Sequence, residues 1–191
     1  MTAHATRIPE ALTHNFDPAP GPLRNICALP DAEAERIIDE IRASGRRSIK
    51  ANYLRRRRAV EDWLIAKRRR KLGRTRLERP LYFFLGDFAD GLDPSRPESL
   101  IMPLAAFSPD CLTFTYPDSM ASLPLARRDE HAAERRPYHG QVFTLSEIKA
   151  VVAEVGMPGD CRKTDPARRY DRFIEVQVWD DRPVEPLLDR R

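Results

Sequence analysis

The chain has 191 residues and a mass of 22.0 kDa, which is enough for one substantial domain or one domain with an arm. No apolar run approaches the length of a membrane helix and the first residues do not resemble a secretory signal, so we expect a cytoplasmic protein without a membrane partner. Three scattered cysteines, with no zinc spacing, predict free thiols. The net charge of +4 mildly favours anionic partners.

The N-terminal part is predicted to contain an irregular arm and then a helix. Residues 1–24 carry four prolines and little hydrophobic periodicity, which indicates an arm without regular structure. A helix should follow, because Pro30 suits a first helical turn, Asp31 complements the helix dipole and Gly45 is placed to end it.

A second helix, predicted over residues 51–72, is long and very basic. Its arginines and lysines form two dense clusters, and Arg57 in the first cluster lies eleven residues before Arg68 in the second. Eleven residues are close to three full turns, so these two side chains should project on nearly the same side, about 16 Å apart. Glu61 is within i,i+4 reach of Arg57 and should offset part of its charge.

This basic helix has two interpretations. Its lysine and arginine stems could simply cover apolar neighbours, with the charges solvated. Alternatively, because both clusters are dense and share a side, the helix could present a phosphate-binding face. The nucleic-acid contacts would then come from Arg56, Lys67 and Arg68.

From residue 79 onward the pattern changes to short apolar strands. Aromatic and β-branched runs predict strands at residues 81–85, 100–104 and 112–116, and Pro103 favours a sheet edge for the second of them. Residues 124–140 have mixed charge and are predicted to form a surface excursion.

The clearest helix signal follows that excursion. Thr144 and Glu147 form a capping box, in which the hydroxyl and the carboxylate each satisfy a free backbone amide. Glu147 is therefore interpreted as a cap rather than a catalytic acid. Gly156 is placed to end the helix.

The last predicted strand, residues 173–179, carries one carboxylate, Glu175, within an apolar run. Side chains alternate along a strand, so Phe173, Glu175, Gln177 and Trp179 share a face, and the opposite, aliphatic face is assigned to a core. An acid and an amide between two aromatics are typical of a ligand pocket. The plainer alternative is an edge strand with its polar side chains solvated.

The order of these elements indicates an α+β fold. N-terminal helices come first, and a mixed, mostly antiparallel sheet with one interposed helix follows. Residues 25–191 are expected to form a single domain, with a basic helical part at 29–73 and a sheet part at 79–185. The strand that carries Glu175 should pair in the same sheet as the first and third strands, with the capped helix packed on it.

Missing motifs exclude several kinds of chemistry. The sequence has no G-x-G-x-x-G, no Walker loop and no G-x-S-x-G elbow, and its histidines and acids lack metal-site spacing, so no metal is expected. Polar and aromatic groups at strand ends remain, and with Glu175 they could enclose a phosphate-bearing aromatic ligand, although core or rim packing is the favoured interpretation for Tyr82 and for Tyr116. These groups are Tyr82, Tyr116, Asp118, Ser119, Tyr138 and His139.

Three short motifs, taken in order, resemble the DarT-type branch of the ADP-ribosyltransferase fold. Residues 80–83, PLYF, resemble the family's P-x-Y-F strand, and residues 112–118, LTFTYPD, resemble V-x-F-T-D. Residues 172–178, RFIEVQV, fit the late R-x-x-E-x-x-V strand, whose Glu is catalytic. The likeness covers residues 79–185. The family's opening Tyr-His-x-Thr-His strand has no counterpart at residues 23–27, which lack histidine.

This resemblance implies an enzyme that consumes NAD and modifies a nucleic acid, as a bacterial toxin or phage-defence protein with an antitoxin or immunity protein as a partner. Glu175 would bind the ribose 2′-hydroxyl and stabilise an oxocarbenium-like charge, and Gln177 on the same face would contact the nucleic-acid acceptor. Arg57 is a candidate for the pyrophosphate contact. The other NAD contacts would come from Tyr82, Tyr116, Ser119 and His139.

Two other functions remain open. The first is a non-enzymatic nucleic-acid-binding module that uses the basic helix 51–72. The second is a small structural or regulatory protein with an ordinary charged surface. Glu175 discriminates between the enzyme and the simple binder, because an acid in a phosphate-binding cleft repels nucleic acid.

Overall fold

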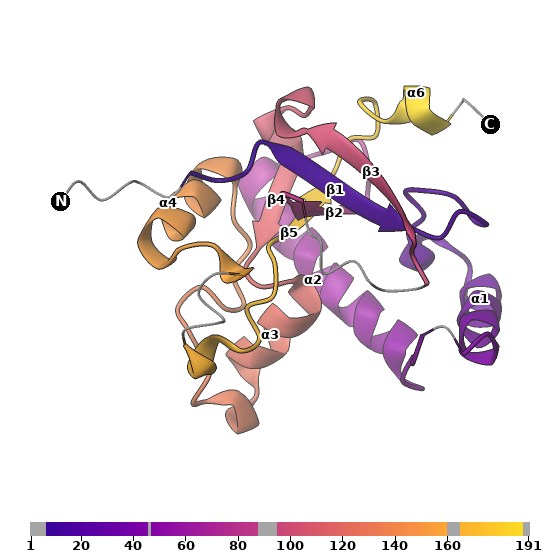
Figure 1. The fold of residues 1–191 in the computed structure, drawn as a ribbon, viewed down its shortest axis with the longest axis horizontal. Coiled ribbons are helices and arrows are strands. Elements are labelled where there is room, and N and C mark those ends of the chain that lie inside the picture. The colour runs from indigo at the N-terminus through magenta and orange to yellow at the C-terminus, as the bar shows by residue number, and fades with distance from the viewer. Residues whose placement is uncertain (1–6, 46, 88–94, 160–164, 189–191) are drawn as a thin grey trace.

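The computed structural model describes residues 7–45, 47–87, 95–159 and 165–188. In these ranges an antiparallel sheet has the strand order β3-β1-β2-β5-β4, with helices around it (Figure 1), so the α+β class and the mostly antiparallel sheet are confirmed. The strands are β1 (Ala11–Phe16), β2 (Leu81–Leu85), β3 (Glu98–Pro103), β4 (Leu112–Thr115) and β5 (Glu175–Val178). The helices are α1 (Asp31–Ala43), α2 (Tyr53–Leu72), α3 (Ser119–Arg127), α4 (Leu145–Val155) and α6 (Glu185–Leu188).

β5, which carries Glu175, lies inside the sheet between β2 and β4. Glu175 is opposite Phe84 of β2 on one side and Thr115 of β4 on the other. The prediction that these three strands share one sheet is confirmed. The alternative of an edge strand for Glu175 is wrong, because β5 has a hydrogen-bonded neighbour on each side, whereas β3 does lie at an edge as predicted.

The segment expected to be an irregular arm instead holds β1, which lies between β3 and β2. Its second face is polar but buried, with Thr13 and Asn15 both inside the protein. Thr13 Oγ1 donates to the Gly86 carbonyl oxygen at 2.7 Å, and Ser99 Oγ donates to Asn15 Oδ1 at 2.7 Å. Because neighbouring elements satisfy these groups, polar residues occupy buried positions that an apolar alternation does not reveal.

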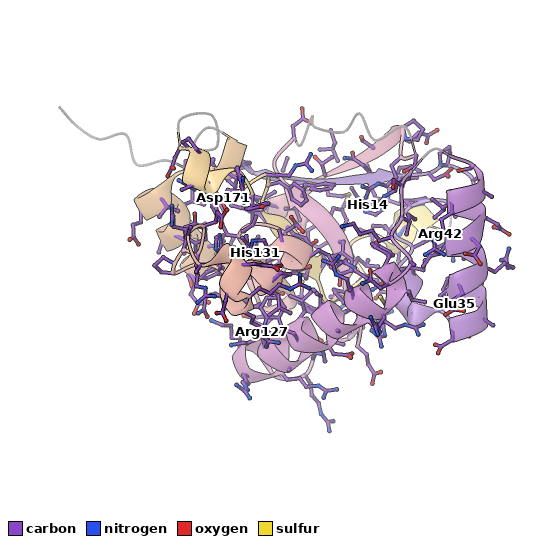
Figure 2. The ribbon with its side chains drawn as sticks, turned by 90° about the horizontal axis from the view of Figure 1, so that it is seen from below. His14, Glu35, Arg42, Arg127, His131 and Asp171 are labelled. Carbon is purple, nitrogen blue, oxygen red and sulfur yellow. The ribbon has the colours of Figure 1, made fainter. Side chains whose placement is uncertain are left out.

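β1 also carries His14, which lies on the α1 side of the molecule (Figure 2). His14 Nε2 accepts a hydrogen bond from the Leu23 amide at 2.8 Å, so Nδ1 is the protonated nitrogen and donates to the Tyr82 carbonyl oxygen at 2.7 Å. Burial lowers the pKa of His14, which favours this neutral tautomer. His14 thus fixes the loop after β1 against β2.

The described residues contain α3 as well as α4 between β4 and β5, rather than the single interposed helix that was expected. The additional helix is α3, and Asp118 caps it by accepting a hydrogen bond from the Ala121 amide at 3.1 Å. Asp suits turns and helix caps equally, and Pro124 inside the helix argued against regular structure. Part of the surface excursion expected at residues 124–140 is therefore helical.

Different helices cover the two faces of β5. Ile174, Val176 and Val178 pack in one hydrophobic cluster with α4, which contributes Ile148 and Val152. Trp179, on the opposite face, packs in a second cluster with α2 and α3, through residues that include Val60, Trp63, Leu64 and Leu123. The face of β5 that carries Glu175 is therefore the one under α2. None of the helices in the described ranges is long and apolar enough to cross a membrane.

Candidate functional site

α2 lies along the face of β5 that carries Glu175 and Trp179. Arg57 on α2 meets Glu175, and Arg68, three turns later, meets Trp179, with its guanidinium carbon 4.8 Å from the indole ring centre. The spacings agree, because eleven helical residues rise about 16 Å and four strand residues about 13 Å. Arg57 and Arg68 therefore share a side, as predicted, but both are buried against the sheet.

Four of the predicted site residues come together around the Arg57 guanidinium. Arg57 Nη1 lies 3.8 Å from Glu175 Oε2 and donates a hydrogen bond to Ser119 Oγ at 3.3 Å. The guanidinium carbon lies 3.9 Å from the centre of the Tyr82 ring, within cation–π range. The side chains of Arg57 and Glu175 expose 11% and 10% of their surface. A cation, a carboxylate, a hydroxyl and an aromatic ring thus meet in a nearly buried place.

This cluster has unused hydrogen-bonding capacity. A guanidinium has five N–H donors, and within the described part of the chain Arg57 donates one hydrogen bond. Glu175 Oε1 accepts a hydrogen bond from Gln177 Nε2 at 3.0 Å, whereas Oε2 makes only the longer contact with Arg57 among the described residues. The cluster is therefore suited to a ligand that offers both an anion and a hydroxyl.

Asp118, after β4, adds a second carboxyl group to this charged cluster. Burial, and after it the negative charge of Glu175, raise the pKa of Asp118 from 3.8 to about 6. Burial alone would lower the pKa of Arg57, because it disfavours the charged form. The neighbouring Tyr82 and Glu175 outweigh this effect and raise the pKa of the guanidinium. A buried carboxyl group with a raised pKa beside a second carboxylate is typical of acid–base sites.

Glu61 supports this cluster by binding Tyr82. It is fully buried, and its Oε1 accepts hydrogen bonds from the Tyr82 hydroxyl at 2.7 Å and from Asn25 Nδ2 at 2.8 Å, while Oε2 pairs with Arg79. Burial raises the pKa of Tyr82 well above its usual range, although Arg57 opposes the shift, so Tyr82 remains a neutral donor. The sequence spacing predicted that Glu61 lies near Arg57. No sequence pattern predicted the hydrogen bonds that Glu61 accepts from Tyr82 and Asn25.

Gln177 does not contact solvent and supports Glu175 instead. Its side chain is fully buried, and its Oε1 accepts a hydrogen bond from Thr113 Oγ1 at 2.9 Å. Its Nε2 donates to Glu175 and to Thr115 Oγ1, at 3.0 and 3.2 Å. Trp179 Nε1 extends the network by donating to Thr113 Oγ1 at 2.8 Å. The nucleic-acid contact expected of Gln177 is inconsistent with this burial, and its place is that of a positioning residue.

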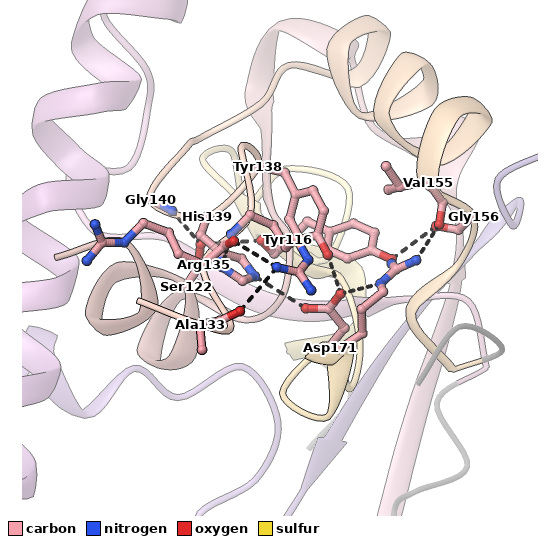
Figure 3. Close-up of polar contacts among 12 residues, drawn as sticks. Tyr116, Ser122, Ala133, Arg135, Tyr138, His139, Gly140, Val155, Gly156 and Asp171 are labelled. Atoms are coloured by element: carbon pink, nitrogen blue, oxygen red, sulfur yellow. Dashed lines mark hydrogen bonds and ion pairs between the residues drawn. The ribbon is translucent and has the colours of Figure 1, made fainter. Parts of the chain in front are cut away.

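Two expected NAD contacts, Tyr116 and His139, belong to a different cluster, built around the buried Asp171 (Figure 3). Asp171 accepts hydrogen bonds from the Tyr138 hydroxyl at 2.5 Å and from Arg168 Nε at 2.8 Å, and His139 Nε2 lies 3.4 Å from it. Arg168 also donates to the Tyr116 hydroxyl. These hydrogen bonds lower the pKa of Asp171 although burial opposes the shift. Tyr116 and His139 therefore have the contacts of a buried structural network.

The residues expected to contact nucleic acid are also divided by the fold. Arg56 and Lys67 are half-buried on α2, whereas Arg68 is only 4% exposed. Arg68 Nη1 donates to the Gly73 carbonyl oxygen at 3.1 Å, beyond the helix end. The interpretation of this helix face as solvated is therefore wrong for Arg68. The exposed positive charge lies on neighbouring residues of α2.

Within the described ranges, no group of three or more His, Cys, Asp and Glu side chains is arranged to hold a metal ion. Cys27 and Cys111 are free and buried, and burial raises the pKa of both thiols to about 11, which disfavours the nucleophilic thiolate. Cys161 lies outside the described residues. Comparisons with protein-family models, with curated proteins and with solved structures found no match.

Proposed function

We propose that the protein is an NAD-dependent ADP-ribosyltransferase that modifies a nucleic acid. The observation that carries this proposal is the pairing of Glu175 with Arg57 at 3.8 Å, beside Tyr82 and Ser119 and with hydrogen-bonding capacity left over. NAD offers a pyrophosphate for the cation, a ribose hydroxyl for the carboxylate and two aromatic rings. The order of the three motif-bearing strands supports the same proposal.

The reaction requires stabilisation of positive charge on the ribose. As the bond between the ribose and nicotinamide breaks, nicotinamide leaves with the bonding electrons and the ribose becomes oxocarbenium-like. Glu175, held by the Gln177 amide, would accept a hydrogen bond from the 2′-hydroxyl and stabilise that charge. An acceptor group would then form the new bond to the ribose, and Asp118, with its pKa raised to about 6, would take the acceptor's proton.

Glu175→Gln tests this proposal through nicotinamide release from NAD. The variant keeps the shape of the side chain but removes its charge, so turnover should fall by about 10²–10³, equivalent to about 2.7–4 kcal/mol. kcat and kcat/KM should fall together, because the lost interaction belongs to the transition state. Glu154→Gln on the exposed part of α4 is the matched control and should leave the rate unchanged. Equal turnover by the wild-type protein and Glu175→Gln would refute the assignment.

The second candidate is a nucleic-acid-binding module without enzymatic activity. It is favoured by the exposed basic side chains at the end of α2, which include Arg69, Arg70 and Lys71. Such a module would bind an oligonucleotide in a salt-dependent manner and release no nicotinamide from NAD. The two functions are therefore separated by the turnover assay and not by binding.

A further inference from the structure

A groove of about 680 Å³ opens where α2 ends and the chain turns back toward β2. Its lining is dominated by arginines, and Glu78 is the acidic residue among its described lining residues. The lining residues include Arg68, Arg69, Arg74, Thr75, Arg76 and Glu78. This groove takes no part in the contacts around Glu175, since Arg68 and Arg57 are separated by three turns of α2.

Two arginines of the groove keep their charge available. Arg76 is engaged, because its Nε donates to Asp181 Oδ1 at 2.6 Å and its Nη2 pairs with Glu185. Arg69 and Arg74 are exposed, and within the described part of the chain neither forms an ion pair with an acidic side chain. The helix dipole accounts for cations in the last turn of α2. It does not account for Arg74, which lies beyond the helix end.

Arg68 holds a fixed positive charge at the groove. It is 4% exposed, and its Nε is buried without a hydrogen-bond partner among the described residues. Its Nη1 donates to the Gly73 carbonyl oxygen and its guanidinium packs on Trp179, so the side chain is held in place while one donor is unused. A buried donor left unpaired costs about 1–3 kcal/mol. A guanidinium that is held in place at the wall of a basic groove contributes a fixed charge toward binding phosphate.

We propose that this groove binds the phosphate backbone of a single nucleic-acid strand, an inference that rests on the proposed function in taking nucleic acid as the acceptor. Arg68 provides a fixed positive charge at the groove, and Arg69 and Arg74 provide the exposed contacts. The volume suits one or a few nucleotides of a strand. Trp179 is fully buried, so recognition relies on phosphate rather than on base stacking.

The test is binding of a fluorescent single-stranded oligonucleotide of about 12 nucleotides, measured by anisotropy without NAD. In the full chain, Arg69→Gln combined with Arg74→Gln should weaken binding about tenfold and reduce the log–log salt slope by about 1.4, or about 0.7 for each lost contact. The matched control is Arg55→Gln with Arg127→Gln, two exposed arginines outside the groove lining. The control should bind like the wild-type protein.

Several outcomes would overturn the proposal. Wild-type affinity in the groove variant, or an equal loss in the control, would show that net charge rather than the groove determines binding. Arginine-dependent binding to anionic phospholipid vesicles without binding to the oligonucleotide would assign the groove to a membrane surface. Glu175→Gln should bind the oligonucleotide as the wild-type protein does, so failure of the NAD assay and failure of the groove are distinguishable.

Discussion

At the scale of single residues, the charge of Arg57 is stabilised by several neighbours at once. Glu175 supplies a counter-charge at 3.8 Å, Ser119 accepts a hydrogen bond, and the Tyr82 ring lies against the guanidinium. Removing one partner of a buried ion pair typically costs about 3–5 kcal/mol, because it leaves the other charge uncompensated. Here Asp118 provides a second carboxyl group near the same charge. The pKa of Asp118 therefore depends on the charges of Glu175 and Arg57 as well as on burial.

Asp118→Asn should remove a pH-dependent cost to stability. The folded-state pKa of Asp118 is about 6 against 3.8 for the ordinary group, so the folded state binds more protons between these values. The stability that this group contributes is fully present below pH 3.8 and is lost as the pH rises through about 6. Asparagine caps a helix as well as aspartate does and does not titrate. The variant should therefore gain stability over the wild-type protein as the pH rises, by up to about 3 kcal/mol.

Urea unfolding at pH 4 and at pH 8 measures this difference. The wild-type protein and Asp118→Asn should be close in stability at the lower pH and should diverge at the higher one. In a Glu175→Gln background the divergence should shrink, because the charge of Glu175 contributes to the raised pKa of Asp118. A constant difference at both pH values would mean that Asp118 keeps an ordinary pKa in the folded protein.

At the scale of secondary structure, β1 is the element that the sequence concealed. Leu12 is fully buried and lies opposite Leu85 of β2 and Met102 of β3. Leu12→Ala should therefore cost about 2–5 kcal/mol of unfolding free energy, as in a packed core. The same change in an irregular arm would cost less than about 0.5 kcal/mol.

The matched control for Leu12→Ala is Ile101→Ala on the edge strand β3. Ile101 is 58% exposed, so its truncation should cost little. Urea denaturation curves give both free energies. If Leu12→Ala were as mild as Ile101→Ala, β1 would not be part of the core sheet.

At the scale of the whole molecule, the predictable features were those set by local periodicity. The capping box at Thr144 starts α4 as expected, and the alternation along β5 places Glu175 and Trp179 on one face. The helical period likewise places Arg57 and Arg68 on one side of α2. The three strands that carry the family-like motifs also lie in one sheet.

The features that could not be predicted depend on partners far away in the sequence. Thr13 can be buried in β1 because the Gly86 carbonyl oxygen accepts its hydrogen bond. Gln177 can be buried because Thr113 and Glu175 satisfy its amide. His139 lies with Asp171, thirty-two residues later, rather than with Glu175. A polar side chain gives no sign in the sequence of whether water or another polar group will satisfy it. The division between the Glu175 cluster and the Asp171 network was therefore visible only in the fold.

Both candidate sites lie along the contact between α2 and the sheet strand β5. The Glu175 cluster lies at one end of this contact, and the arginine groove lies at the other end, where Arg68 meets Trp179. The two ends are about 13–16 Å apart along the strand and the helix. A nucleic-acid strand bound in the groove and NAD bound at Glu175 would therefore lie on the same side of the sheet.

The most direct test of the central claim is a titration of the isotope-labelled protein with NAD, followed by NMR of its side-chain N–H signals. We expect saturable shifts of the Arg57 Nε–H and Gln177 Nε2–H₂ signals, because the first would contact the pyrophosphate and the second holds Glu175. The Nε–H signal of Arg36, which pairs with Glu40 on α1, should stay in place. Unchanged Arg57 and Gln177 signals at saturating NAD, or shifts confined to Arg69 and Arg74 in the groove, would contradict an NAD site at Glu175.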